Sequence, residues 1–301
     1  MARQSIKNTV LTVIIGLLLS HGWGQHALTD AVVVDYEKNK NASAALQKMY
    51  KVIEQENNES YAHYTLGFFL KENYKLTPEL EPSKQFRENA LLAFDEALKL
   101  NFNQDQLLIE NINKAQKYII STLYNDALLK AKQFQQGNEN SADAAYDYFE
   151  SWNNKSITPQ SSRALRIEFE KRKSERYYEF WEADVDALEW LNRCIQLYEK
   201  ILKEDPTDCE AMNNIAIIYY NIGVFKIKQI DAKIEFDALM KIQDDALALF
   251  HQALPYAQAT FNDCPKSATQ YKALMFIYRA IGNDEQFNQL QQEFKTKFPQ
   301  E

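Results

Sequence analysis

Few side chains in this chain of 301 residues have the types and spacing that catalysis needs. Beyond the first 24 residues the only histidines are His26, His63 and His251. His63 falls at a bulky packing position of a helical segment and His251 flanks an apolar one, so packing or surface placement is the simpler interpretation. The sequence also lacks His-Glu-x-x-His, Cys-x-x-Cys, a glycine-rich phosphate loop and Gly-x-Ser-x-Gly. We therefore predict no catalytic residue, no metal site, no cofactor and no enzymatic activity.

Two groups of acidic residues are spaced as acids on helix faces: Asp143, Asp147 and Glu150, and Asp184, Asp186 and Glu189. A glycosidase needs two carboxylates held across a cleft. Nothing in either group singles out such a pair, so we interpret both as solvated acidic faces.

One aromatic cluster, formed by Tyr177, Tyr178, Trp181 and Trp190, is the candidate ligand site. These side chains could line a concave groove that binds a partner. Helical spacing alone also predicts them as core between stacked helices. Both interpretations stay open at the level of sequence.

The first residues have the pattern of an export signal. Arg3 and Lys7 precede an apolar run over 10–19, and Gly22 and Gly24 then stand two apart, as in a signal peptidase site. We predict cleavage after Gly24; the alternative is an uncleaved anchor, for which the run is short. The absence of a following cysteine argues against a lipoprotein, and no later stretch is long enough to span a membrane.

The charge of the predicted mature chain narrows its partners. Removing the signal takes away two of the 34 basic residues and none of the 42 acidic ones, which leaves a net charge of −10. An acidic chain is a poor match for nucleic acid, which is bound through Lys and Arg. It is an equally poor match for an anionic membrane surface.

The composition predicts an all-α chain. Glycine and proline occur only seven times each, helix formers abound, and no sustained period-2 alternation predicts a strand. The polar turn formers over 153–162 form the best linker. We expect a signal peptide over 1–24, helical repeats over 25–152 and further repeats over 163–301.

One spacing pattern recurs along these helices. It is clearest in the order Cys194, Tyr198, Ile201, Pro206, Ala211, Ile215, Ala216, Tyr219 and Gly223. It returns at Leu66, Gly67, Ala90, Phe94 and Ala97, and again at Ala246, Phe250, Ala253, Tyr271, Leu274, Tyr278 and Gly282. Small residues at these positions let two antiparallel helices approach closely. The pattern resembles the tetratricopeptide repeat, a helix–turn–helix unit that stacks into a solenoid.

The resemblance implies an irregular right-handed solenoid of four to six hairpins, with insertions at 75–86 and 224–241. The stretch Ala246–Leu290 is similar to the end of exported tetratricopeptide-repeat proteins of Gram-negative envelopes. The resemblance implies a non-catalytic periplasmic module that binds a protein or peptide, or scaffolds a complex. The alternative is a helical envelope protein that captures a carbohydrate or small ligand with the aromatic cluster.

The same resemblance bears on the three cysteines. Cys194 occupies a small-residue position, where a buried inert thiol is expected. Cys209 begins one repeat's first helix and Cys264 ends its second, so both lie at one end of a hairpin. A disulfide between them is possible in an oxidising compartment; the alternative is two free thiols too far apart.

Overall fold

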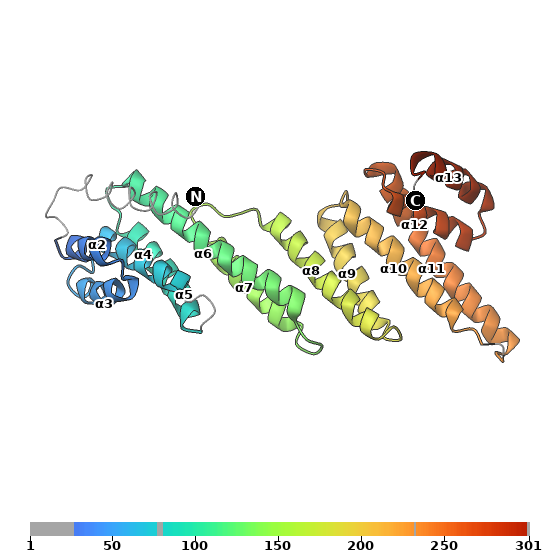
Figure 1. Cartoon of the computed structure of the whole chain (residues 1–301), viewed down its shortest axis with the longest axis horizontal. Helices are drawn as coiled ribbons and strands as arrows, with labels where there is room; N and C mark the ends of the chain where they lie inside the picture. The colour runs from blue at the N-terminus through green and yellow to red at the C-terminus, as the bar shows by residue number, and fades with distance from the viewer. Residues whose placement is uncertain (1–26, 77–80, 232, 300–301) are drawn as a thin grey trace. The chain divides into compact units, whose positions relative to one another are not determined.

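The computed structural model describes residues 27–76, 81–231 and 233–299, and within these ranges the chain is all-α. The described helices are α2 (Ala27–Asn39), α3 (Ala42–Ile53), α4 (Ser60–Leu76), α5 (Glu81–Lys99), α6 (Gln106–Gln133), α7 (Asn140–Asn153), α8 (Ser162–Ala183), α9 (Glu189–Glu204), α10 (Cys209–Lys228), α11 (Phe236–Asp263), α12 (Ala268–Ala280) and α13 (Asp284–Lys297) (Figure 1). The predicted fold class is confirmed, and the described segments contain no strand. The predicted signal peptide over 1–24 lies outside the described residues.

Short polar side chains set where several helices begin. The Asp208 carboxylate accepts a hydrogen bond from the amide of Ala211 at the start of α10. Ser267 and Gln270 form a reciprocal capping box at α12. Such side chains satisfy backbone N–H groups that have no partner within the helix. The starts of these helices are therefore determined by neighbouring residues in the sequence and do not require contacts with other helices.

The chain divides into two compact units. Unit 1 holds residues 1–126 and 147–160, and unit 2 holds residues 127–146 and 161–301. The division at 160/161 falls inside the predicted linker, but residues 127–146 group with the C-terminal unit although we placed them with the N-terminal repeats. Because α6 continues without a glycine or proline through residue 126, the sequence offers no local signal for that part of the division.

Consecutive helices pair as hairpins within each unit. In unit 1, α3, α4 and α5 pack in sequence, and α2 contacts both α3 and α4. In unit 2, α8 packs on α9, α10 on α11 and α12 on α13. The predicted insertion at 224–241 is mostly helical, because it lengthens the end of α10 and the start of α11. In the insertion at 75–86, residues 77–80 lie outside the described part.

Two glycines allow the closest helix contacts. A Cβ atom added at Gly67 would lie 2.6 Å from the Phe94 ring, and one at Gly223 would lie 2.5 Å from the Phe250 ring. No side chain fits at those distances, so a phenylalanine can pack directly on the backbone of the facing helix. The close approach that the repeat spacing predicts is present in both units.

The cysteines of unit 2 lie where the repeat positions suggested. The sulfur atoms of Cys209 and Cys264 are 2.06 Å apart and their Cα atoms 5.8 Å apart, which is the geometry of a disulfide. The bond links the first residue of α10 to the residue that follows α11. Whether it forms in the compartment where the chain works stays a prediction. Cys194 is a free, buried thiol.

Candidate functional site

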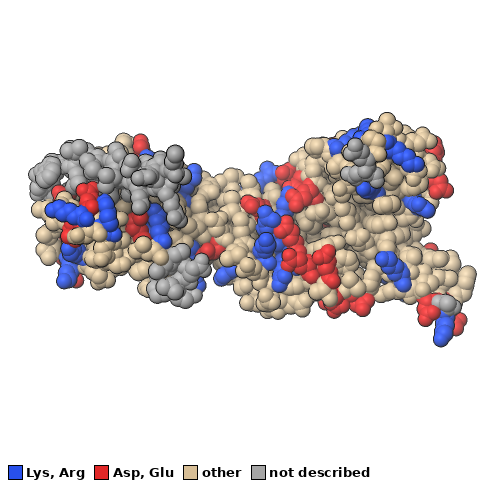
Figure 2. Space-filling model, viewed as in Figure 1, with Lys and Arg blue, Asp and Glu red and all other residues tan. Residues whose placement is uncertain are grey.

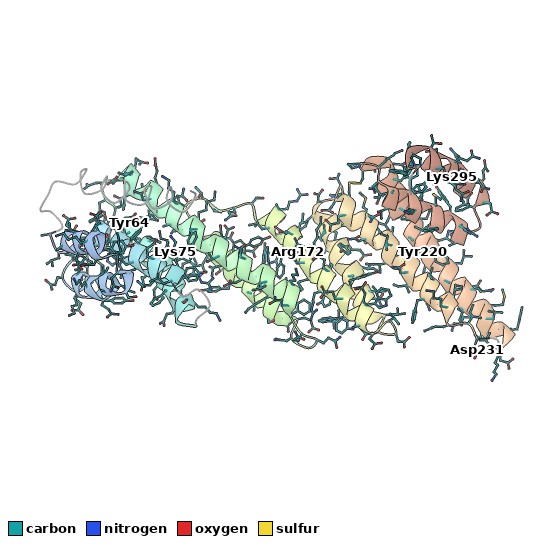
Figure 3. All side chains as sticks on the ribbon, viewed as in Figure 1. Tyr64, Lys75, Arg172, Tyr220, Asp231 and Lys295 are labelled. Carbon is teal, nitrogen blue, oxygen red and sulfur yellow. A yellow bond between two sulfur atoms is a disulfide. The ribbon has the colours of Figure 1, made fainter. Side chains whose placement is uncertain are left out.

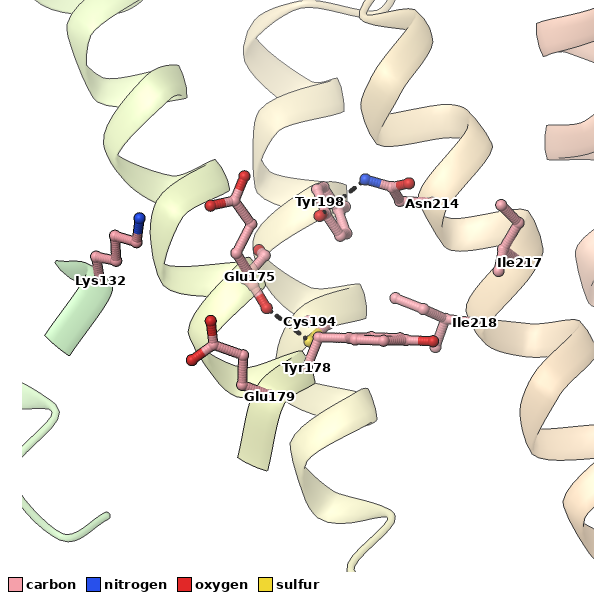
Figure 4. A pocket seen from close by; sticks show the side chains of 10 residues that line it. Lys132, Glu175, Tyr178, Glu179, Cys194, Tyr198, Asn214, Ile217 and Ile218 are labelled. Carbon is pink, nitrogen blue, oxygen red and sulfur yellow. Dashed lines mark hydrogen bonds between the residues drawn. The ribbon is translucent and has the colours of Figure 1, made fainter. Parts of the chain in front are cut away.

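Unit 2 contains a cavity of about 480 Å³ between α8, α9 and α10 (Figure 4). Its lining residues are Lys132, Ser174, Glu175, Tyr178, Glu179, Cys194, Tyr198, Asn214, Ile217 and Ile218. Three helices of two successive hairpins therefore contribute to one site, together with a lysine from the end of α6. A cavity of this size suits a side chain or a short segment of a partner.

The floor of the cavity is buried and neutral. The Asn214 amide donates a hydrogen bond of 2.9 Å to the Tyr198 hydroxyl, and the Cys194 thiol donates one of 3.3 Å to the Ser174 carbonyl. Burial raises the pKa of the Cys194 thiol to about 12, and burial also raises the pKa of the Tyr198 hydroxyl. Cys194 is therefore protonated at neutral pH and is not a nucleophile.

The rim of the cavity carries charge. Glu175 and Glu179 lie one turn apart on α8, and both side chains are exposed. Arg172 pairs with Glu175 at 3.0 Å and Arg176 pairs with Glu179 at 2.6 Å. Exposed ion pairs between residues one helical turn apart are weak, so a charged group of a ligand can replace one partner of such a pair. Figure 2 shows acidic side chains gathered beside a band of basic ones over the region of α8.

Beyond the cavity, the same face of α10 continues with polar and aromatic side chains. Ile217, Tyr220 and Asn221 are half-buried and follow Asn214 at helical spacing. The Tyr220 ring stacks on the ring of Phe276 from α12 with centroids 6.4 Å apart, and Phe276 is 46 % exposed (Figure 3). Amide, hydroxyl and aromatic groups of α8 and α10 thus line the cavity, and a partly exposed aromatic pair of α10 and α12 lies further along α10.

The predicted aromatic cluster splits between core and cavity. Tyr177 and Trp190 are only 6 % and 9 % exposed and stack on each other with centroids 5.8 Å apart. The Trp181 indole N–H donates to the Val185 carbonyl just past α8. Tyr178 alone of the four lines the cavity. The structure therefore places Tyr177 and Trp190 in the interior and Tyr178 at the cavity, whereas Trp181 is half-buried and lies outside the cavity lining.

Sequence reasoning missed most of the cavity. Asn214, Ile217 and Tyr198 line it but were not candidates. Asn214 and Ile217 could have been recognised from the sequence. On α10 they fall between the positions that the repeat uses to pack the hairpin. Tyr198 could not have been recognised in this way, because it occupies a packing position itself.

The described histidines and acidic residues, which we interpret as packing or surface side chains, have local partners or exposed positions. The His63 ring lies 2.8 Å from the Asn57 carbonyl and borders a shallow hollow of about 280 Å³ in unit 1, whereas His251 is exposed. Asp143 pairs with Lys173 at 2.7 Å. Among the described residues no group of three or more His, Cys, Asp or Glu side chains could hold a metal ion.

No described helix combines the length and the apolar character that crossing a membrane requires. The predicted export signal lies outside the described residues and stays a prediction.

Comparisons with known proteins return distant structural similarities only. No family profile matches the sequence, and no curated protein matches it. A TPR repeats protein from Bacteroides fragilis aligns with a TM-score of 0.42 at 15% identity, over 91% of this chain and 99% of that one. The nuclear import adaptor Nro1 from S. pombe aligns with a TM-score of 0.32 at 10% identity, over 90% of both chains.

The human IFIT1 dimer with m7Gppp-AAAA aligns with a TM-score of 0.36 at 13% identity. The alignment covers 85% of this chain but only 46% of that one, so the chain spans less than half the length of IFIT1. Similarities this low do not identify a ligand for this chain.

Proposed function

We propose that this chain is a non-catalytic interaction module that binds a segment of a protein partner along the face formed by α8, α10 and α12. The observation that carries the proposal is the cavity of about 480 Å³ between α8, α9 and α10, which is lined by hydroxyl, amide and aromatic groups. Its one thiol is buried and neutral. Such a lining supports binding and orientation rather than bond making.

The chemistry of the face suggests how a segment is held. The amides of Asn214 and Asn221 can each give and accept a hydrogen bond, which suits the backbone of an extended peptide. The half-buried ring of Tyr178 offers a surface for an apolar side chain. The net acidic chain favours a basic or neutral segment over an acidic one.

Export to the periplasm is part of the proposal. The residues that support it are the basic start, the short apolar run and the small residues at Gly22 and Gly24. N-terminal sequencing of the protein recovered from its cells tests this directly. A mature chain that begins at Gln25 supports export, and a chain that retains Arg3 refutes cleavage.

Photocrosslinking in cells tests the binding function. A photoreactive residue at Asn221 should crosslink one or a few proteins, which mass spectrometry then identifies. Ile217→Asp should abolish the crosslink because it places a charge on the apolar wall of the face. Gln196→Ala, an exposed position on α9, is the matched control and should leave it unchanged.

Two outcomes contradict the proposal: no enriched protein, or the same proteins with Ile217→Asp. The alternative function, capture of a carbohydrate or small ligand, needs exposed indole faces. Trp190, at 9 % exposed, does not offer one, and the half-buried Trp181 does not line the cavity. Quenching of Trp fluorescence by glycans and not by peptides would nevertheless replace the protein partner with a sugar.

A further inference from the structure

The α10–α11 hairpin carries a second surface that the proposed function does not use. Four large apolar side chains are exposed on it: Ile227 at 39 %, Phe236 at 71 %, Met240 at 41 % and Leu247 at 39 %. Ile227 comes from the end of α10 and the other three from the first half of α11. None of the four lines the cavity between α8, α9 and α10.

A seven-residue spacing connects this surface to a contact already present in the fold. Met240, Leu247, Leu254 and Phe261 follow one another every seven residues along α11, and such residues lie along one face of a helix. In the second half of this row, Leu254 packs on the core shared with α12, and Phe261 meets Tyr271 of α12 at 4.8 Å between centroids. The row is therefore a helix-packing face, and α12 occupies its C-terminal half.

The N-terminal half of the row has no such cover because α12 is short. α12 has 13 residues, whereas α11 has 28. Beside the row, the Gln258 amide donates to the Tyr278 hydroxyl at 2.9 Å near the end of α12. On this face, the residues of α11 from Phe236 to His251 are exposed, whereas Leu254 is half-buried. Figure 1 shows α11 running on beyond α12 toward its own N-terminal end, and Figure 3 labels Asp231 at that free tip.

The contacts that α10 makes with α12 also stop before the end of α10. Tyr220 stacks on Phe276 of α12, and Ile227 lies two turns further on, on the same face of α10. Both helices of the hairpin thus present apolar side chains past the end of α12. We propose that this surface, Ile227, Phe236, Met240 and Leu247, docks an amphipathic helix of a partner protein that continues the line of α12 and carries basic residues along one flank.

The charges beside the row select this occupant over a second copy of the chain. Asp237 and Asp244 are exposed and lie seven residues apart, at the positions that flank the row. If α11 paired antiparallel with its own copy, Asp237 and Asp244 would face each other, and like charges at flanking positions oppose pairing. Lysine or arginine at the same spacing on a partner helix would instead form ion pairs with both carboxylates.

Two synthetic helices test the surface. Each is a fluorescein-labelled peptide of about 21 residues with leucine at the core heptad positions, flanked by lysine in one peptide and by glutamate in the other. We expect the chain to bind the lysine peptide at least about tenfold more tightly, as measured by fluorescence anisotropy at low salt. The double variant Met240→Gln/Leu247→Gln should weaken that binding about tenfold or more.

The controls separate this surface from general stickiness. Leu129→Gln removes an equally large leucine that is 52 % exposed elsewhere in unit 2, and it should leave binding unchanged. Asp237→Lys/Asp244→Lys should reverse the preference between the two peptides. These positions are exposed, so both variants should keep the thermal melt of the parent chain.

Equal binding of the two peptides, or binding that survives Met240→Gln/Leu247→Gln, would overturn the proposal. Sedimentation velocity supplies the other decisive outcome. A dimer of the parent chain that Met240→Gln/Leu247→Gln dissociates would assign the surface to a second copy and overturn the partner helix. The peptide-binding face of α8, α10 and α12 uses other residues, so either result leaves the proposed function to its own test.

Discussion

The hairpins α4–α5 and α10–α11 use the same packing contact, one in each unit. In the first, Phe94 packs on Gly67, and in the second, Phe250 packs on Gly223. Each glycine is followed after 27 residues by its phenylalanine. In both hairpins, a glycine that faces a phenylalanine thus lets the two helices pack closely.

The two hairpins differ in what covers them. Twelve of the 17 residues of α4 are buried, whereas only seven of the 20 residues of α10 are. The tyrosine three residues before each glycine shows the difference most directly. Tyr64 is 5 % exposed and has its ring 6.1 Å from Phe94, and Tyr220 is half-buried with its ring 5.5 Å from Phe250.

The comparison teaches that the repeat positions fix the hairpin but not its surroundings. α4 contacts α2, α3 and α5, and α10 likewise contacts α9, α11 and α12, but the positions of α4 outside the repeat pattern are buried. On α10 the equivalent positions stay accessible and form part of the candidate binding face. Function in such a fold is decided at the positions that the repeat leaves free.

The largest expected effect tests the shared contact. Phe94→Ala and Phe250→Ala should each destabilise their own unit by about 3–5 kcal/mol, because each removes a buried ring that no neighbour can replace. Hydrogen exchange of peptides from the two units reads the effect separately. If Phe250→Ala loosened both units equally, the two hairpins would not be independent in the way the comparison assumes.

The next effect distinguishes the hairpins. Reduction of Cys209–Cys264 should lower the stability of unit 2 by about 2–4 kcal/mol and leave unit 1 unchanged, because the bond closes a long loop only in α10–α11. The measurement is a denaturant titration with and without dithiothreitol. Cys209→Ser/Cys264→Ser is the control, and any further effect of dithiothreitol on that variant would show that the bond is not its target.

A smaller effect measures the difference in cover. Tyr64→Ala should cost about 1–2 kcal/mol more than Tyr220→Ala, because only Tyr64 is fully removed from water. Chemical unfolding of the two variants supplies the difference. Equal losses would mean that α10 is as well packed as α4, and would remove Tyr220 from the candidate binding face.

The last effect appears only in alkaline solution. Burial raises the pKa of the folded Cys194 thiol to about 12 from the ordinary value of 9.0. The folded state therefore favours the neutral thiol, and its contribution to stability is present below about pH 9 and is lost as the pH rises toward 12. Cys194→Ala should remove this part of the pH dependence between about pH 8 and 10.5. An unchanged alkaline slope in the variant would contradict the burial of the thiol.

Much of the fold could be predicted because its determinants are local. Gly67, Phe94, Gly223 and Phe250 follow a spacing that only close helix packing explains, and the hairpins form where that spacing occurs. The grouping of residues 127–146 with unit 2 could not be predicted, since it depends on contacts such as the hydrogen bond from Arg176 to the Phe134 carbonyl.

The candidate site was less predictable than the fold. Tyr177 and Tyr178 are adjacent in sequence and equally aromatic, yet one is core and the other lines the cavity. Which of them faces inward depends on how α9 and the end of α6 pack on α8. That information lies in tertiary contacts, and helical spacing alone does not contain it.

The bond between Cys209 and Cys264 also determines what a protease would leave behind. The turn between Lys228 and Phe236 joins α10 to α11 at an exposed tip, where proteases cut most easily. Cys209 and Cys264 lie on opposite sides of that turn. A chain cut once there would stay covalently whole, migrate as one species without reductant, and fall into two fragments only when the disulfide is reduced.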